Sequence, residues 1–204
     1  MNNGMEQAAG STHLNDDALM AQMVDGDLTV LGELYLRHSA MVHGALGRFA
    51  PLMPDAEIQE MSQEVFMLLC KKARHYRQQG KFRAFLYGIA VKKARTWQRN
   101  HLLRHRLLGT ISKDPNPPWQ GPTENCPSER TAQREVVRQV LQRLPKQQRA
   151  VLILYSVEGF NSEEIGEILN ISPQGVRTRL FRARQTLMEN IHSDDWLQSL
   201  QRET

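Results

Sequence analysis

The sequence contains little of what would place it among secreted, membrane or disulfide-rich proteins. Of its 204 residues only Cys70 and Cys126 are cysteines, and no CxxC pair occurs. Two distant cysteines form neither a disulfide framework nor a zinc-ligand pattern, so we expect free thiols in a reducing compartment. No apolar run approaches the roughly 18 residues of a membrane-spanning helix, and the first residues do not form a secretory signal. We therefore expect a cytoplasmic protein.

Motifs for catalysis and cofactor binding are also scarce. The sequence has no Gly-rich phosphate loop, no nucleophile elbow and no HExxH motif. His101 and His105 have the spacing of a metal-binding pair, but arginines rather than carboxylates surround them, which favours a solvent-facing pair. We accordingly expect that the protein is not an enzyme and that it binds no metal and no cofactor.

Acidic residues are missing from one long segment. Residues 71–106 carry twelve Lys and Arg and no carboxylate, whereas residues 1–70 carry ten acidic and only two basic residues. Such dense cations repel one another unless a polyanion lies alongside, and nucleic acid is the expected one. A solvated helix face or a membrane-surface patch is the alternative. Aromatic residues suited to stacking on bases interleave the cations, although several also fit a core stripe: Tyr76, Phe82, Phe85, Tyr87 and Trp97.

Apolar residues in the first half recur at helical spacing and show no β-strand alternation. The spacing predicts two short helices around Asp25-Gly26-Asp27, a third near 41–49, a longer one over about 55–74 and another over 82–106. Because Pro51 and Pro54 follow the third helix, it should end there.

The second half is again helical, and a different composition separates it from the first. Residues 108–127 contain five prolines, which predicts an extended linker. Helical spacing resumes at about Arg134 and continues to about Trp196. The predicted fold class is all-α, with two helical domains joined by an extended Pro-rich linker.

The most specific local pattern is a helix-turn-helix. Asn161 with Glu164 three positions later has the form of a capping box, and Asn170 suits a left-handed turn. Ser172 and Pro173 then suit the cap and first position of a second helix. That helix should bury an apolar stripe and turn polar and basic residues outward, as readout of the DNA major groove requires. The alternative is a helical hairpin with a solvated basic face.

Together the two halves resemble a bacterial sigma factor of the extracytoplasmic-function (ECF) group, whose minimal members consist of conserved regions two and four. EIQEMSQEVFMLL (Glu57–Leu69) and FRAFLYGIAVKKARTWQRN (Phe82–Asn100) resemble region two. LQRLPKQQRAVLILYSVEGFNSEEIGEILNISPQGVRTRLFRAR (Leu141–Arg184) resembles region four. The resemblance implies a region-two domain over 14–106, a flexible linker over 107–133 and a region-four domain over 134–193.

The resemblance also implies partners and site residues. Core RNA polymerase and promoter DNA, as a duplex minus-thirty-five element and a single-stranded minus-ten element, are the expected partners, and an anti-sigma factor stays open as a third. The residues expected to dock on the polymerase are Glu60, Gln63 and Glu64. Those expected at the minus-ten region are Lys81, Arg83, Lys92, Lys93, Arg95, Trp97 and Arg99. Those expected to act in the helix-turn-helix are Ser172, Gln174, Arg177, Thr178, Phe181 and Arg182.

Three positions depart from the pattern of the family, and two rival functions stay open. Family members often have Arg at Gly88, Asn at Lys92 and Asp at Thr96. A helix-turn-helix regulator that acts as a dimer would explain the second half of the chain but not the charged first half. An interaction protein that sequesters a partner would use the same amphipathic helices.

Overall fold

The computed structural model describes residues 14–77, 80–107, 140–141 and 143–192, and the regular elements in these ranges are all helical. This confirms the all-α prediction. The predicted linker over 107–133 lies almost entirely outside the described residues, as do the first 13 and last 12 residues. The elements are α1 (Asp16–Val24), α2 (Val30–Phe49), α3 (Asp55–Lys72), the 3-10 turn η1 (Ala73–His75), α4 (Phe82–Leu107), α6 (Lys146–Ser156), α7 (Ser162–Leu169) and α8 (Pro173–His192).

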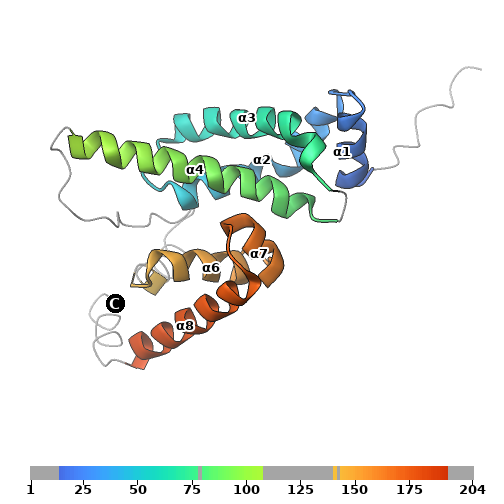
Figure 1. Cartoon of the computed structure of the whole chain (residues 1–204). Coiled ribbons are helices and arrows are strands. Elements are labelled where there is room, and N and C mark those ends of the chain that lie inside the picture. The colour runs from blue at the N-terminus through green and yellow to red at the C-terminus, as the bar shows by residue number, and fades with distance from the viewer. Residues whose placement is uncertain (1–13, 78–79, 108–139, 142, 193–204) are drawn as a thin grey trace, which may run out of the picture.

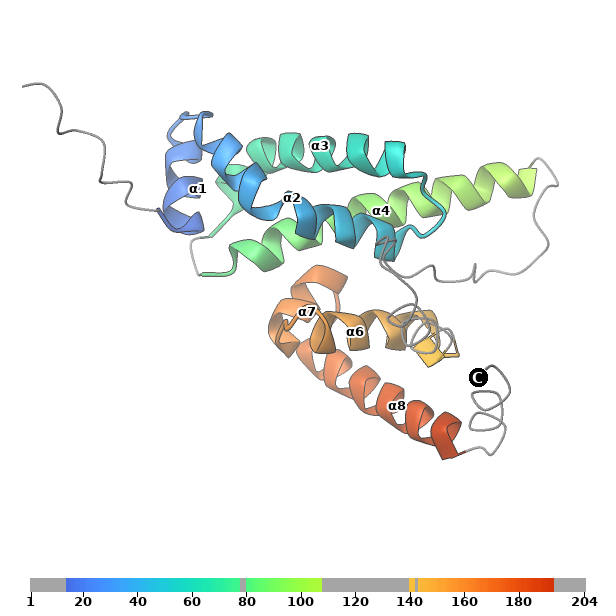
Figure 2. The same cartoon turned by 180° about the vertical axis from the view of Figure 1, so that it is seen from behind.

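The helices form two groups that lie against each other (Figure 1). In the first group α2, α3 and α4 run alongside one another, and α1 covers one end. In the second group α6, α7 and α8 pack together, and α7 lies against α4 (Figure 2). Fully buried side chains occur in both groups, among them Leu34, Tyr87 and Leu154. Helix α4 therefore contacts both α2 and α3 of the first group and α7 of the second.

The chain between residues 30 and 49 differs from its prediction. The sequence pattern predicted two helices here, but the structure has the single 20-residue helix α2. No proline lies between Tyr35 and Met41, and Leu34 and Val42 are both fully buried on the same helix. A gap in the apolar spacing is therefore not enough to end a helix when its backbone hydrogen bonds can continue.

The caps that position the helix-turn-helix confirm their prediction. The Asn161 side chain accepts hydrogen bonds from the backbone N–H groups of Glu163 and Glu164, at 2.9 and 3.0 Å. In return the Glu164 carboxylate accepts the Asn161 backbone N–H at 2.8 Å. At the start of α8, the Ser172 hydroxyl accepts the backbone N–H of Gly175 at 3.1 Å. These bonds satisfy amide groups that the first helical turns leave without partners.

The turn between α7 and α8 depends on two special backbone positions. Asn170 has φ 56°, the left-handed conformation expected of it. Gly166 packs so tightly that a Cβ atom there would lie 2.8 Å from the carbonyl oxygen of Ile171. Only glycine fits this position without a shift of the backbone, so the angle between the two helices is set locally.

We predict that Asn161→Ala lowers the free energy of unfolding by about 1 kcal/mol, because the backbone amides at the start of α7 lose their acceptor. Urea denaturation followed by circular dichroism measures the change as a lower midpoint at an unchanged slope. Asn161→Ser, which keeps a capping oxygen, is the control and should retain most of the stability. Equal losses in the two variants would contradict the assigned cap.

Candidate nucleic-acid and polymerase interfaces

Helix α8 presents the predicted recognition residues to solvent. Val176 and Ala183 are fully buried against α6 and α7, and the opposite side of the helix is exposed. The exposed residues include all six that the sequence assigned to the helix-turn-helix: Ser172, Gln174, Arg177, Thr178, Phe181 and Arg182. Phe181 has 62% of its surface exposed, which is unusual for a phenylalanine and suits a contact made on binding.

Two of these residues are held in a defined position before any DNA is bound. The Arg177 Nε donates a hydrogen bond to the Gln174 side-chain oxygen at 3.1 Å. The Thr178 hydroxyl donates to the backbone carbonyl of Gln174 at 3.0 Å. An oriented guanidinium beside an amide is a suitable arrangement for guanine and adenine edges in the major groove.

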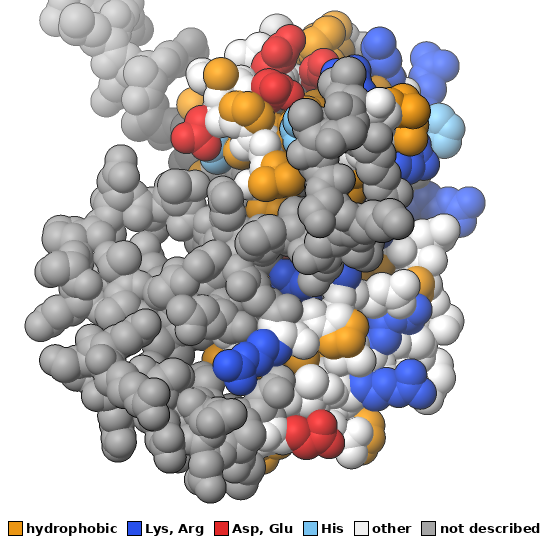
Figure 3. All heavy atoms as spheres, turned by 90° about the vertical axis from the view of Figure 1, so that its left-hand side faces the viewer, with side chains coloured by type: hydrophobic (Ala, Val, Ile, Leu, Met, Phe, Trp, Pro, Cys, Tyr) orange, Lys and Arg blue, Asp and Glu red, His pale blue; other side chains and the backbone are white. Residues whose placement is uncertain are grey.

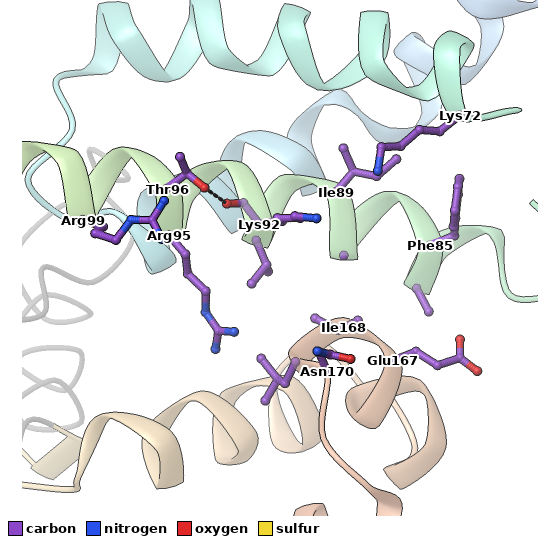
Figure 4. A pocket seen from close by; sticks show the side chains of 14 residues that line it. Lys72, Phe85, Ile89, Lys92, Arg95, Thr96, Arg99, Glu167, Ile168 and Asn170 are labelled. Carbon is purple, nitrogen blue, oxygen red and sulfur yellow. Dashed lines mark hydrogen bonds between the residues drawn. The ribbon is translucent and has the colours of Figure 1, made fainter. Parts of the chain in front are cut away.

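The predicted minus-ten residues do not share one surface, because α4 turns them toward two different neighbours. Lys92, Arg95 and Arg99 line a cleft of about 730 Å³ between α4 and α7 (Figure 4). Ile168, Leu169 and Asn170 line the cleft from the α7 side. Burial lowers the pKa of Arg95, whose guanidinium also lies 5.6 Å from the ring centroid of Phe49.

Lys81 and Arg83, at the beginning of α4, contact the second group of helices. The Lys81 ammonium pairs with Glu167 of α7 at 3.1 Å, and this carboxylate raises the pKa of Lys81. The Arg83 guanidinium pairs with Glu158 at 3.3 Å and lies 4.7 Å from the ring centroid of Phe160. Both cations are thus paired with carboxylates of the part of the chain that resembles region four, although the resemblance assigned the cations themselves to the minus-ten element.

Lys93 and Trp97 face α3 instead. Lys93 forms an ion pair with Glu64, and the Trp97 Nε1 donates a hydrogen bond to Glu57 at 2.7 Å. The ring of Trp97 stacks on His101 with a centroid distance of 4.5 Å and an angle of 14° between the planes. These contacts tie α4 to α3, so the two residues also have a structural role.

The interpretation of the interleaved aromatics as a stacking surface is wrong for Phe82 and Tyr87. Phe82 is 2% exposed and Tyr87 is fully buried, so neither ring is accessible to a base. Both lie on the side of α4 that packs against the other helices of the first group and against Phe160. Burial raises the pKa of the Tyr87 phenol, and the charge of Glu158 raises it further. Phe85 and Trp97 stay partly accessible.

The acidic side of α3 carries the predicted polymerase-docking residues. Glu60 and Gln63 are exposed, whereas Glu64 is partly covered through its ion pair with Lys93. Figure 3 views the end of the molecule where α3 begins, and most of the acidic side chains visible there lie together in the upper part of the view. Within the described ranges no group of three potential metal ligands occurs, and no helix is long and apolar enough to cross a membrane.

Sequence reasoning missed three residues that the structure brings together. Arg48 of α2 and Glu158 of the α6–α7 turn form an ion pair, and Phe160 lies beside them on Tyr87 with centroids 5.2 Å apart. The only sequence signal was a charged residue next to an apolar one in a turn, which is typical of a solvated loop. Glu158 is 110 positions from Arg48 and 75 positions from Arg83, so no local pattern could reveal these contacts.

Comparison with known proteins identifies the class. A family model described as sigma-70 region 2 matches residues 34–104, and one described as sigma-70 region 4 matches residues 134–187. The protein therefore belongs to the RNA polymerase sigma factors. Within that class it is a member of the ECF group, since ECF sigma factors are among its relatives, and a dimeric helix-turn-helix regulator would not explain the match to region 2.

Individual relatives support this placement. The chain is 29% identical to the ECF RNA polymerase sigma factor ShbA of Streptomyces griseus, over 83% of this chain and 92% of that protein. It is 30% identical to the probable RNA polymerase sigma factor RfaY of Xanthomonas campestris over 67% of its own length, which is 34% of that longer protein. Its fold is similar to the solved structure of CnrH in complex with the cytosolic domain of CnrY, with a TM-score of 0.61, 22% identity and coverage of 88% of this chain and 98% of that one.

We predict that the fluorescence of Trp97 reports the protonation of His101 with a midpoint below the ordinary histidine value of about 6.5. Burial lowers the pKa of His101, the charges of His105 and Arg104 lower it further, and the Glu57 carboxylate opposes them without reversing the direction. A protonated imidazole stacked on an indole quenches its emission, so emission should stay high until the pH falls below that value. The measurement uses a variant in which the other two tryptophans, Trp119 and Trp196, are replaced by phenylalanine, so that all the indole emission comes from Trp97. His101→Gln is the control, and a transition that survives it would contradict the stacked geometry.

Proposed function

We propose that three surfaces of this sigma factor divide the work of promoter recognition. The exposed acidic side of α3 docks on core RNA polymerase, the cleft side of α4 holds the melted minus-ten strand, and the exposed side of α8 reads the minus-thirty-five duplex. The observation that carries this proposal is the separation of these surfaces on three helices, each with the charge that its partner requires.

The charges on the cleft side of α4 support its assignment to the minus-ten strand. Lys92 and Arg99 are exposed cations for which no carboxylate partner occurs among the described residues. A phosphate backbone would neutralise them, and Phe85 in the same cleft offers a ring to an unstacked base. Lys93, in contrast, already has Glu64, so we assign it to the packing of α4 on α3 rather than to the strand.

The proposal extends to the setting in which the protein acts. It would work in the cytoplasm, where the polymerase and promoters are. It would catalyse no covalent reaction, because polymerisation belongs to the core enzyme. An anti-sigma factor is a further proposed partner, since a solved structure of similar fold is that of the sigma factor RpoE in complex with the anti-sigma factor NepR from Bartonella quintana.

We expect Arg177→Ala and Gln174→Ala each to weaken minus-thirty-five selectivity by about 1 to 3 kcal/mol, because each removes a contact to a base edge. Competition between promoter variants in run-off transcription measures this selectivity. Arg179→Ala is the matched control: it removes the same charge, but Arg179 faces α6, where its Nε donates a hydrogen bond to the Gln147 side-chain oxygen at 3.2 Å. If all three variants select promoters as the wild type does, the orientation proposed for α8 is wrong.

We expect Glu60→Lys to reduce affinity for core polymerase strongly, because it reverses a charge on the proposed docking surface without breaking an ion pair that the structure shows. Glu60 is a sharper test than Glu64, whose replacement would also release Lys93. Asp25→Lys makes the same charge change in the exposed loop after α1 and should bind core normally. Labelled protein titrated with purified core provides the affinities, and normal binding by Glu60→Lys would refute the docking surface.

A further inference from the structure

A single carboxylate of α1 holds both ends of the loop that leads into α4. One side-chain oxygen of Asp17 accepts a hydrogen bond from the Tyr76 hydroxyl, and the other accepts the backbone N–H of Gly80 at 2.9 Å. Tyr76 directly follows η1, and Gly80 lies two residues before α4 begins at Phe82. Two points of the chain, 59 and 63 positions after Asp17, are therefore tied to one side chain.

The backbone at Gly80 suits this contact. Gly80 has φ 68°, in the left-handed region that glycine enters without steric cost. Nothing lies within 4 Å of the position of a Cβ atom there, so the backbone conformation and not a lack of space explains the glycine. The next residue is Lys81, the first of the cations that the resemblance assigns to the minus-ten region.

Tyr76 connects Asp17 to the ring that we propose for contact with a base. The centroid of the Tyr76 ring lies 5.2 Å from that of Phe85 and 6.0 Å from that of Phe82. Phe82 is buried, whereas Phe85 is partly exposed and lines the cleft. The hydrogen bond to Asp17 therefore fixes the orientation of a ring that lies directly against Phe85.

Helix α1 is held in place independently of this loop. Its apolar side is buried, and Asp16 pairs with Arg37 and His38 of α2 at 3.1 and 2.9 Å. In Figure 1, α1 covers the end of the bundle where α3 ends and α4 begins. Two adjacent carboxylates thus have different tasks, because Asp16 holds α1 on α2 and Asp17 holds the loop on α1. Helix α1 lies outside residues 34–104, which match region 2.

We propose that Asp17 is a positioning residue for recognition of the melted minus-ten strand. Asp17 itself touches no DNA. It holds Tyr76 against Phe85 and fixes the backbone next to Lys81, so a base and a phosphate meet groups that are already oriented. Orienting such groups before binding improves both affinity and selectivity. This role rests on the proposed function of α4, whereas the two hydrogen bonds do not.

Neighbouring variants separate positioning from stability. Asp17→Ala removes both hydrogen bonds, and Tyr76→Phe removes one of them but keeps a ring against Phe85. Asp17→Asn keeps the shape of the side chain but only one acceptor oxygen. Asp16→Ala is the matched control, because it removes the same charge from the same turn of α1 and breaks contacts to α2 instead. Urea denaturation measures the stability of each variant.

Amide hydrogen exchange, followed by NMR, tests the contact without polymerase or DNA. We expect the Gly80 amide to exchange about tenfold faster in Asp17→Ala, because it loses a charged acceptor. Exchange at Gly80 should stay close to the wild-type rate in Asp16→Ala and in Tyr76→Phe, which keep that bond. An unchanged rate in Asp17→Ala would overturn the assigned contact and the proposal with it.

Selection from a pool of single strands tests the role of the contact. Each protein, bound to core polymerase, is offered single-stranded DNA with randomised bases, and sequencing of the bound strands gives the base preference at each position. We expect the strongest preference to fall about tenfold in Asp17→Ala, the factor that one charged hydrogen bond supplies. The fall should be smaller in Asp17→Asn and Tyr76→Phe. Asp16→Ala should keep the wild-type preference even where it lowers stability.

The outcomes distinguish this inference from the proposed function. An unchanged preference in Asp17→Ala, or equal losses in Asp16→Ala and Asp17→Ala, would leave Asp17 a structural residue and overturn the proposal. Phe85→Ala and Lys92→Ala test the strand-binding side of α4 itself. If neither weakens strand binding, the proposed function of α4 and the positioning role both fail. If both weaken it while Asp17→Ala selects strands as the wild type does, only the positioning role fails.

Discussion

The neutralisation of α4 is the constraint around which the other helices are arranged. Neither α4 nor the segment leading into it contains a carboxylate, so every counter-charge must come from another part of the chain. On one side α3 supplies Glu57 and Glu64, within the same group of helices. On the other side the second group supplies Glu158 and Glu167. The carboxylates of α3 belong to the same bundle as α4, whereas Glu158 and Glu167 reach α4 only because the two groups of helices lie against each other.

Features encoded within a few residues could be predicted from the sequence. The caps at Asn161 and Ser172 and the left-handed turn at Asn170 each depend on neighbours no more than four positions away, and all three occur as expected. The exposed side of α8 followed from the spacing of its apolar residues in the same way. Helix ends were less predictable, since α2 continues through a stretch in which the apolar pattern is interrupted.

Features that depend on which surfaces meet could not be predicted. Aromatic rings in a basic segment suggest stacking on bases, yet Tyr87 is buried because Phe160 of the second group covers it. The partner of Glu158 in α2 is 110 residues away, a separation over which no local pattern carries information. The sequence does reveal that Gly88 is unusual, but only the structure shows that it lies where α4 crosses α7, with the Cα atom of Ile168 3.8 Å from the position of a Cβ atom.

The position of Arg48 has a consequence for how such a protein can evolve. It belongs to neither of the surfaces proposed to touch DNA, and it lies on a different helix from the residues proposed to bind the polymerase. Substitutions at this one residue can therefore change how the two groups of helices are held together without touching the residues proposed to contact promoter DNA or the polymerase. Selection can act on the packing of the molecule and on its proposed contacts as independent traits, within a single short chain.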